Sequence, residues 1–185
     1  MLIDITTVVP NNSPLIAWAK SQDNQHVAMG HVGTHLDTYE KSNIPLEYFK
    51  SKGILFDVRD KAEVFTDDIE ISKINKGDFV IFRTGQIEKY AYRAKEYFND
   101  HPQLSKELIQ ALIEKQIHFI GMDCAGIRQH LEHEEADRLC EQGKIYVIEN
   151  LCNLAKIVDA DFTVYTMWLE DEEMTGLKCR VLIEQ

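Results

Sequence analysis

The order of short apolar runs and helical stripes in the middle of the chain is the feature that most restricts its fold. Apolar runs with the length of buried strands alternate there with segments whose apolar residues recur at helical spacing. The runs occupy residues 53–58, 78–83, 118–122 and 144–148, and helices are expected at 105–115 and 132–142. Ser105 suits the N-cap of the first helix, and Gly143 suits the C-cap of the second. This order favours a sheet with helices packed against it.

Both ends of the chain show strand-like runs without helices between them. Residues 2–6 predict a strand, and residues 162–169 and 177–183 predict a final antiparallel pair. About seven strands and two or three helices follow from the whole pattern. We therefore predict an α/β fold with a mixed β-sheet and flanking helices. The chain has 185 residues and no repeat or Pro/Gly-rich linker, so we expect one domain over residues 1–185.

The charge balance restricts the classes of partner. The chain carries 31 acidic and 20 basic side chains, which give a formal net charge of −11. Nucleic acids and anionic membranes both need a basic face, so neither is an expected partner. No signal peptide or membrane-spanning run is recognisable, and we expect a cytoplasmic protein. The cysteines form no CxxC pair and are expected to be free, mostly buried thiols: Cys124, Cys140, Cys152 and Cys179.

A cluster of metal-ligating residue types lies near the N-terminus. His31, Gly33, His35 and Asp37 fall at intervals of two, which on an extended strand would direct all four positions to one face. Two imidazoles and one carboxylate suit zinc, and also manganese or iron. Three protein ligands would leave coordination positions free, as in catalytic sites. The alternative is that the histidines are hydrogen-bonded surface residues.

Several segments together resemble one known family. His31-x-Gly33-Thr34-His35-x-Asp37 resembles the signature of the cyclase-like metal-dependent hydrolases, which include bacterial kynurenine formamidase and isatin hydrolase. The opening strand, Gly121-Met-Asp123 and Ile148-Glu149-Asn150-Leu151 are similar to family segments and follow in the same order. The histidine signature and the Glu-Asn-Leu segment are the most specific of these.

The resemblance implies a fold, a metal centre and a reaction. The fold would be of the swivelling β/β/α type. His31, His35 and Asp37 would bind a divalent cation, zinc or manganese, with Glu149 taking part in the centre. The cation would activate water to open an amide, formamide or cyclic amide of a small-molecule substrate. The family also implies a homodimer or a higher homo-oligomer.

The chain departs from the family pattern at two positions. Lys41 stands where the family has a proton-transferring histidine. It can be a solvent-exposed lysine, a catalytic proton donor or acceptor, or a fixed charge for an anionic substrate group. Asp137 stands where the family has a further histidine ligand, twelve residues before Glu149. It is either an oxygen ligand of a second metal position or a solvated helix residue.

A few other side chains are weaker candidates for the site. His133 precedes Asp137 by four residues and can share its helical face, although a solvated histidine in an acidic stretch is the favoured interpretation. Arg128 can bind a substrate carboxylate, and Trp18 and Tyr39 can line an apolar pocket. Two functional hypotheses follow, namely a metal-dependent hydrolase and a metal- or ligand-binding protein that has lost catalysis. A third possibility is a purely structural interaction domain, which would bind no metal.

Overall fold

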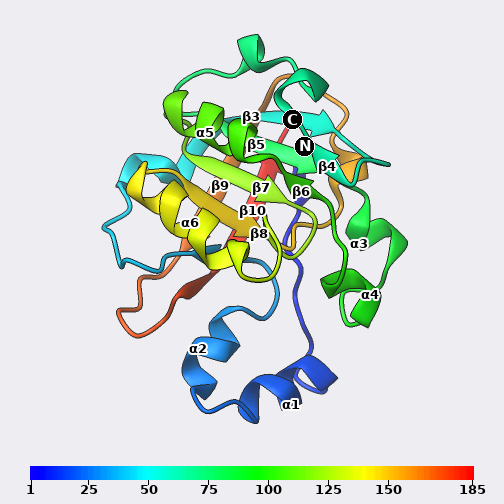
Figure 1. Ribbon diagram of the computed structural model, residues 1–185, viewed down its shortest axis with the longest axis vertical. Helices are drawn as coiled ribbons and strands as arrows, with labels where there is room; N and C mark the ends of the chain where they lie inside the picture. The colour runs from blue at the N-terminus through cyan, green and yellow to red at the C-terminus, as the bar shows by residue number, and fades with distance from the viewer.

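A sheet of eight strands forms the centre of the protein (Figure 1), whose computed structural model describes residues 1–185. The strand order is β1-β10-β2-β8-β7-β5-β3-β9, and β10 also pairs with β9. The sheet strands are β1 Leu2–Asp4, β2 His35–Asp37, β3 Lys50–Asp57, β5 Phe79–Arg83, β7 Phe119–Met122, β8 Tyr146–Glu149, β9 Phe162–Trp168 and β10 Gly176–Glu184. A separate pair consists of β4 Glu63–Val64 and β6 Gln103–Leu104.

Helices lie around this sheet. They are α1 Pro14–Lys20, α2 Gln25–Gly30, α3 Gln86–Lys89, α4 Lys95–Phe98, α5 Lys106–Glu114 and α6 Glu132–Gln142. Short 3-10 turns occupy Leu46–Phe49, Thr66–Asp68, Ile71–Lys73 and Leu154–Lys156. The predicted α/β fold with a mixed sheet and flanking helices is confirmed, because β3, β5, β7 and β8 are parallel and the other pairings within the eight-stranded sheet are antiparallel.

The pairing of β9 with β10 makes the sheet curl back on itself. Since β10 also pairs with β2, the strands from β2 through β8, β7, β5, β3 and β9 close into a ring. Buried side chains such as Phe79, Phe119 and Ile148 fill the inside of that ring, together with those of β9 and β10. Alternate residues of the same strands, Val80 and Ile120 among them, point outward to the helices and form a second core. Burial on both faces explains why the parallel strands are almost continuously apolar.

The two longest helices follow the sequence prediction closely. The Ser105 hydroxyl accepts a hydrogen bond from the backbone amide of Leu108 and so caps α5, which packs Leu108 and Leu112 into the outer core. The helix α6 ends at Gly143, as predicted. The predicted number of strands and helices is too low, because the structure has ten strands and six α-helices. The missed ones are mostly elements of two to seven residues, which have too few positions to show a period.

The N-terminal signature differs from the predicted extended segment. Residues 25–30 form the helix α2, and only His35–Asp37 form a strand. The Asn24 side chain caps α2 by accepting a hydrogen bond from Val27, and Gly33 turns the chain with a φ of 85°. His31 therefore follows a helix end and does not share a strand face with His35. In Figure 1, α1 and α2 project below the sheet.

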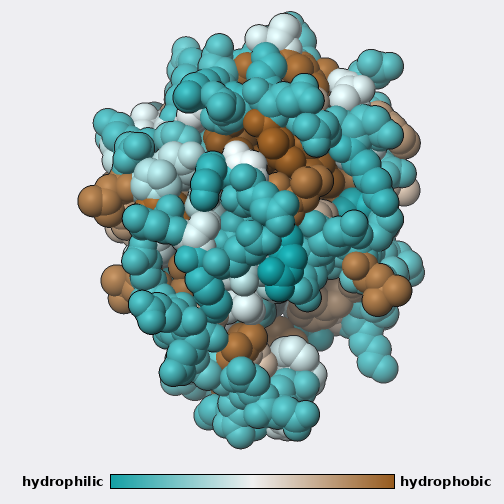
Figure 2. Space-filling model, turned by 60° about the vertical axis from the view of Figure 1, so that its left-hand side comes forward, coloured by the Kyte–Doolittle hydropathy of each residue, from teal (hydrophilic) through white to brown (hydrophobic).

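The surface is mostly hydrophilic on the face shown in Figure 2, where apolar residues gather in one patch in the upper half. The chain ends meet, since the amino group of Met1 donates a hydrogen bond to the carbonyl oxygen of Gln185. None of the helices combines the length and the apolar character needed to cross a bilayer.

Candidate metal centre

The strand β2 and the helix α6 place acidic and imidazole side chains around the end of β8. The antiparallel register of β2 and β8 puts His35 directly opposite Glu149. On the other side of Glu149, α6 packs against β8 and contributes His133 and Asp137, which lie one helical turn apart. Two groups of three potential ligands result, His31–His35–Asp37 and His133–Asp137–Glu149, and within each group the ligand atoms lie within 4.8 Å of one another.

The first group converges on the Asp37 carboxylate. His31 Nδ1 and His35 Nε2 are 3.1 Å apart, and each lies 3.4 Å from Asp37 Oδ1. His35 and Asp37 are almost completely buried, whereas the His31 side chain remains 25% exposed. The group therefore opens to solvent on the His31 side.

The second group is built in the same way around His133. Its Nε2 lies 3.4 Å from Asp137 Oδ2 and 3.5 Å from Glu149 Oε1. Both carboxylates are buried, and the His133 side chain is 26% exposed. Glu149 also links the two groups, because its other oxygen, Oε2, lies 3.5 Å from His35 Nε2.

The buried carboxylates have no hydrogen-bond partners that would account for their burial. Both oxygens of Asp37, both oxygens of Asp137 and Oε1 of Glu149 are buried without any hydrogen bond. Unpaired buried carboxylates are strongly unfavourable, and coordination to a metal is one of the few arrangements that offset the cost. Two ligands at about 2.1 Å from one zinc ion at the tetrahedral angle are about 3.4 Å apart. The spacings of 3.1–3.5 Å in both groups fit that value.

Hydrogen bonds fix the orientation of the imidazole rings. His35 Nδ1 lies 3.0 Å from the carbonyl oxygen of Gly33, which can only accept, so Nδ1 carries a proton, and in the neutral ring Nε2 presents its lone pair to the carboxylates. The other nitrogen of His31, Nε2, lies 2.9 Å from the Thr175 hydroxyl. Such outer contacts are typical of metal-binding histidines.

Asn150 holds the Gly33 carbonyl group and Tyr97 holds Asn150. Neither was identified as a site residue from the sequence. The Asn150 amide donates to the Gly33 oxygen at 3.2 Å, and the Tyr97 hydroxyl donates to Asn150 Oδ1 at 2.8 Å. Asn150 adopts a φ of 59°, which asparagine tolerates better than most residues. Its place directly after Glu149 was a usable signal, whereas nothing in the sequence connected Tyr97 with this segment.

The acidic side chains of the candidate centre are buried, and burial shifts their pKa values. Burial, reinforced by the charge of Asp37, raises the pKa of both Asp137 and Glu149 well above the ordinary values. Burial also acts to raise the pKa of Asp37, but the adjacent imidazoles outweigh it and lower that pKa. Burial, together with the charge of His35, lowers the pKa of His31 to about 4. A cation among these groups would favour the ionised carboxylates and the neutral rings.

The other residues that the sequence singled out differ in whether they face the candidate metal centre. His133 is wrongly interpreted as a solvated histidine, because its ring faces two buried carboxylates. The Lys41 ammonium is exposed and donates a hydrogen bond to the carbonyl oxygen of Met174. Arg128 is paired with Glu63 and Glu132. Trp18 lies on α1 and is 52% exposed.

A cavity of about 390 Å³ adjoins the second group. It is lined by Tyr39, Phe98, His101, Ala125, Gln129, His130, His133 and Glu134. Since His133 belongs to the lining, a small molecule in this cavity would contact the candidate metal centre.

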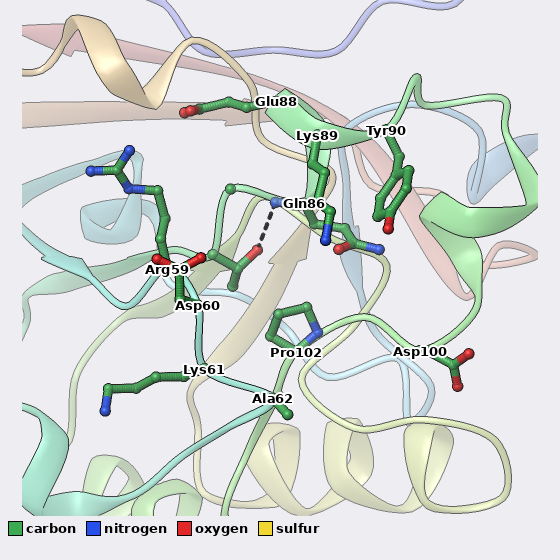
Figure 3. Close-up of a pocket in the computed structure, with 12 residues that line it drawn as sticks. Arg59, Asp60, Lys61, Ala62, Gln86, Glu88, Lys89, Tyr90, Asp100 and Pro102 are labelled. Carbon is green, nitrogen blue, oxygen red and sulfur yellow. Dashed lines mark hydrogen bonds between the residues drawn. The ribbon is translucent and has the colours of Figure 1, made fainter.

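A larger hollow of about 560 Å³ lies near the carboxyl ends of β3 and β5, and Figure 3 shows its charged lining. None of the six candidate ligands lines it. Two of its cations are already paired, Arg59 with Asp57 and Lys61 with Asp68. We therefore place the candidate chemistry at the smaller cavity.

Comparison with protein families gives one match. The sequence profile of the Cyclase family matches residues 3–128. This range includes His31, His35 and Asp37, whereas the second group of ligands lies beyond it. No curated protein matches the chain.

Solved structures share the fold over nearly the whole chain. Isatin hydrolase A from Labrenzia aggregata, bound to benzyl benzoate, superposes with a TM-score of 0.77 at 20% identity, covering 99% of this chain and 93% of that one. A potential metal-dependent hydrolase with cyclase activity gives 0.73 at 22% identity, covering 99% and 96%. Isatin hydrolase A from Ralstonia solanacearum gives 0.76 at 17% identity, covering 99% and 91%. At these identities the likeness establishes the fold.

Proposed function

The chain belongs to the Cyclase family, and on that premise we propose that it is a metal-dependent hydrolase. Its substrate is a small molecule with an amide, formamide or cyclic amide bond, which is opened by water. The observation that carries the proposal is the set of buried carboxylate oxygens of Asp37, Asp137 and Glu149 that accept no hydrogen bond and lie beside three imidazoles.

Two cation positions fit the residues. His31, His35 and Asp37 would hold one ion, and His133, Asp137 and Glu149 would hold the other, with Glu149 within reach of both. Nitrogen and carboxylate donors suit zinc and manganese. A divalent cation bound there lowers the pKa of water and polarises an amide carbonyl, which makes hydrolysis feasible near neutral pH.

The surrounding side chains orient the reactants. Tyr39 lines the cavity, and burial together with the charge of Asp37 raises the pKa of its hydroxyl above the ordinary value. A phenol is protonated near neutral pH, so this hydroxyl can donate a hydrogen bond to a substrate oxygen in the cavity. A role of Lys41 in moving a proton to the leaving nitrogen stays a prediction.

Named relatives of the same fold support the choice of bond. Two of the superposed structures are isatin hydrolases, and isatin is a cyclic amide. This is the reason for screening cyclic amides and formyl-anilides first.

The test combines metal analysis with a hydrolysis screen. Protein purified without chelator is analysed for metal, stripped, reloaded with zinc or manganese, and assayed on formyl-anilides, isatin-like rings and small lactams. We expect turnover that depends on added metal and is lost in His35→Ala. His26→Ala is the matched control, because His26 lies on the surface and pairs only with Asp171.

Two other outcomes have distinct meanings. Bound metal without turnover of any compound would favour the second candidate, a binding protein that has lost catalysis, for which the engaged ammonium of Lys41 is the supporting observation. A stripped protein that takes up no metal would refute the hydrolase and any metal-binding role. Self-association into a homodimer stays a prediction that light scattering tests.

A further inference from the structure

We infer that the two groups of ligands select different metals, zinc in the first group and manganese in the second. The inference rests on the proposed function, because it assigns an ion to each of the two cation positions. It follows from the donor atoms of the two groups and from the space beside them.

The two groups differ in the number of imidazoles that they offer. The first group presents two imidazole nitrogens and one carboxylate. The second group presents the single imidazole of His133 and the carboxylates of Asp137 and Glu149. Imidazole nitrogen suits zinc, whereas carboxylate and water oxygens suit manganese. Having an oxygen donor in place of one nitrogen donor therefore moves the preference of the second group toward manganese.

The neighbouring side chains preserve this difference in donor atoms. Glu149 Oε2 lies 3.5 Å from His35 Nε2, so Glu149 can add an oxygen to the first group without changing the number of imidazoles in either group. His101 and His130 line the cavity beside the second group, but neither contributes to the ligand atoms that lie within 4.8 Å of one another. His101 Nδ1 lies instead 2.9 Å from the carbonyl oxygen of Pro102. The second group therefore keeps one nitrogen donor.

The space beside the two groups favours the same assignment, whereas the distances between donor atoms are similar in both. Zinc is satisfied by a tetrahedron of four ligands, whereas manganese with oxygen ligands prefers an octahedron, which needs additional water. His133 lines the cavity of about 390 Å³, which has room for several waters of about 30 Å³ each. None of the three residues of the first group lines that cavity. The His31 ring instead lies close to Gly176, where an added Cβ would come within 3.0 Å of it.

The direct test locates both metals in crystals of the stripped protein after loading with one equivalent of zinc and an excess of manganese. Zinc is kept limiting, because it binds more tightly than manganese to any site of nitrogen and oxygen donors. Anomalous scattering is recorded at the absorption edges of the two metals. We expect zinc beside His31 and His35, and manganese beside His133. Zinc in the second group, or an equal mixture of the metals in both groups, would overturn the inference.

Asp137→His is the informative variant, because it gives the second group the same donor types as the first. Zinc is titrated into the manganese-loaded protein, and the released manganese is measured from its electron paramagnetic resonance signal. In Asp137→His, the ratio of zinc affinity to manganese affinity at the second group should rise by about tenfold or more, since nitrogen donors favour zinc. Asp137→Asn keeps the shape of the side chain and an oxygen donor, so it should weaken the binding of both ions and leave their ratio within about twofold.

Glu134→Gln is the matched control for charge. Glu134 lies on the same helix as Asp137, but its side chain is 57% exposed, pairs with Arg138 and belongs to neither group. The two metal ions carry the same charge, so removal of this carboxylate should change both affinities equally and leave their ratio as it is. If the ratio rose as much in Glu134→Gln as in Asp137→His, charge would set the preference and the inference would be wrong.

The outcomes separate the inference from the proposed function. Binding of one ion only, or of two ions with the same metal preference, would overturn the inference and leave a metal-dependent hydrolase in place. A stripped protein that binds neither zinc nor manganese would refute the hydrolase itself. All of these readouts report bound metal and none depends on turnover, so the two failures remain distinguishable.

Discussion

Replacing Asn150 by glycine should loosen the metal centre while leaving its ligands in place. The Asn150 amide holds the Gly33 carbonyl oxygen, and that oxygen accepts the Nδ1 proton of His35. Glycine is the informative replacement, because the left-handed φ of 59° at this position costs it nothing. Alanine would add about 1 kcal/mol of backbone strain and confuse the result.

The size of the effect follows from the bonds that are lost. The Tyr97 hydroxyl loses its partner at 2.8 Å, and a buried polar group without a partner costs about 1–3 kcal/mol of the free energy of unfolding. Its oxygen also lies 3.4 Å from the carbonyl oxygen of Asp123, so the loss should be at the lower end, about 1 kcal/mol. Removing a group that orients a ligand typically weakens metal affinity by about 10–100-fold.

Metal affinity is measured by competition with a coloured chelator, and stability by urea unfolding of the metal-free protein. Ser51→Ala is the control, because it removes a half-buried hydrogen bond to His118 at 2.8 Å that has no connection with the candidate ligands. It should lower stability by a similar amount and leave the affinity unchanged. If Asn150→Gly also left the zinc affinity at its original value, the proposed support of His35 through Gly33 would be wrong.

Three further predictions concern the same centre. The buried carboxylate of Glu141 accepts four hydrogen bonds from residues 38–42, and although burial opposes ionisation, these bonds lower its pKa below the ordinary 4.5. Its contribution is therefore complete above pH 4.5 and is lost below it, so Glu141→Gln should cost about 2 kcal/mol near pH 7 in urea unfolding, and the difference should shrink at pH 4. A difference that is constant with pH would contradict this. In Gly176→Ala, the added Cβ would lie 3.0 Å from the His31 ring, and a zinc titration should show one site weakened by about tenfold and the other unchanged. Zinc at a hundred times its Kd should stabilise the stripped protein by about 2.7 kcal/mol in thermal unfolding, and an unchanged melting temperature would argue against a buried cation site.

The elements that could be predicted are those whose local sequence and tertiary environment agree. The helix α5 has a serine cap and an apolar stripe, and α6 ends at a glycine, so local and tertiary interactions favour the same boundaries. The strands β5 and β7 are buried on both faces, and their continuous apolar runs therefore predict them correctly. The helix α2 has no comparable signal, because Gly30 and the single turn of His26 to Met29 give no period.

The first group of ligands was identified for a partly wrong reason. Regular spacing on a strand would have joined His31 to His35, but His31 reaches the site from the end of α2, and the turn at Gly33 separates it from the strand that carries His35. Residue types and closeness in sequence were enough to find the group, since a short loop brings its two parts together. The same spacing argument could not have predicted the orientation of the rings, which depends on Gly33 and Thr175.

The second group depends on contacts that no local pattern contains. Asp137 and His133 become candidate ligands only because α6 packs on β8 with that face inward, and Glu149 reaches His35 only because β2 inserts between β8 and β10. Without that packing, His133 in a stretch with Glu132, Glu134 and Glu135 is an ordinary solvated residue. A helical spacing of four that combines one histidine with one buried acid is therefore a weak signal alone. It becomes strong when a strand end carrying a further acid is expected beside the same helix face.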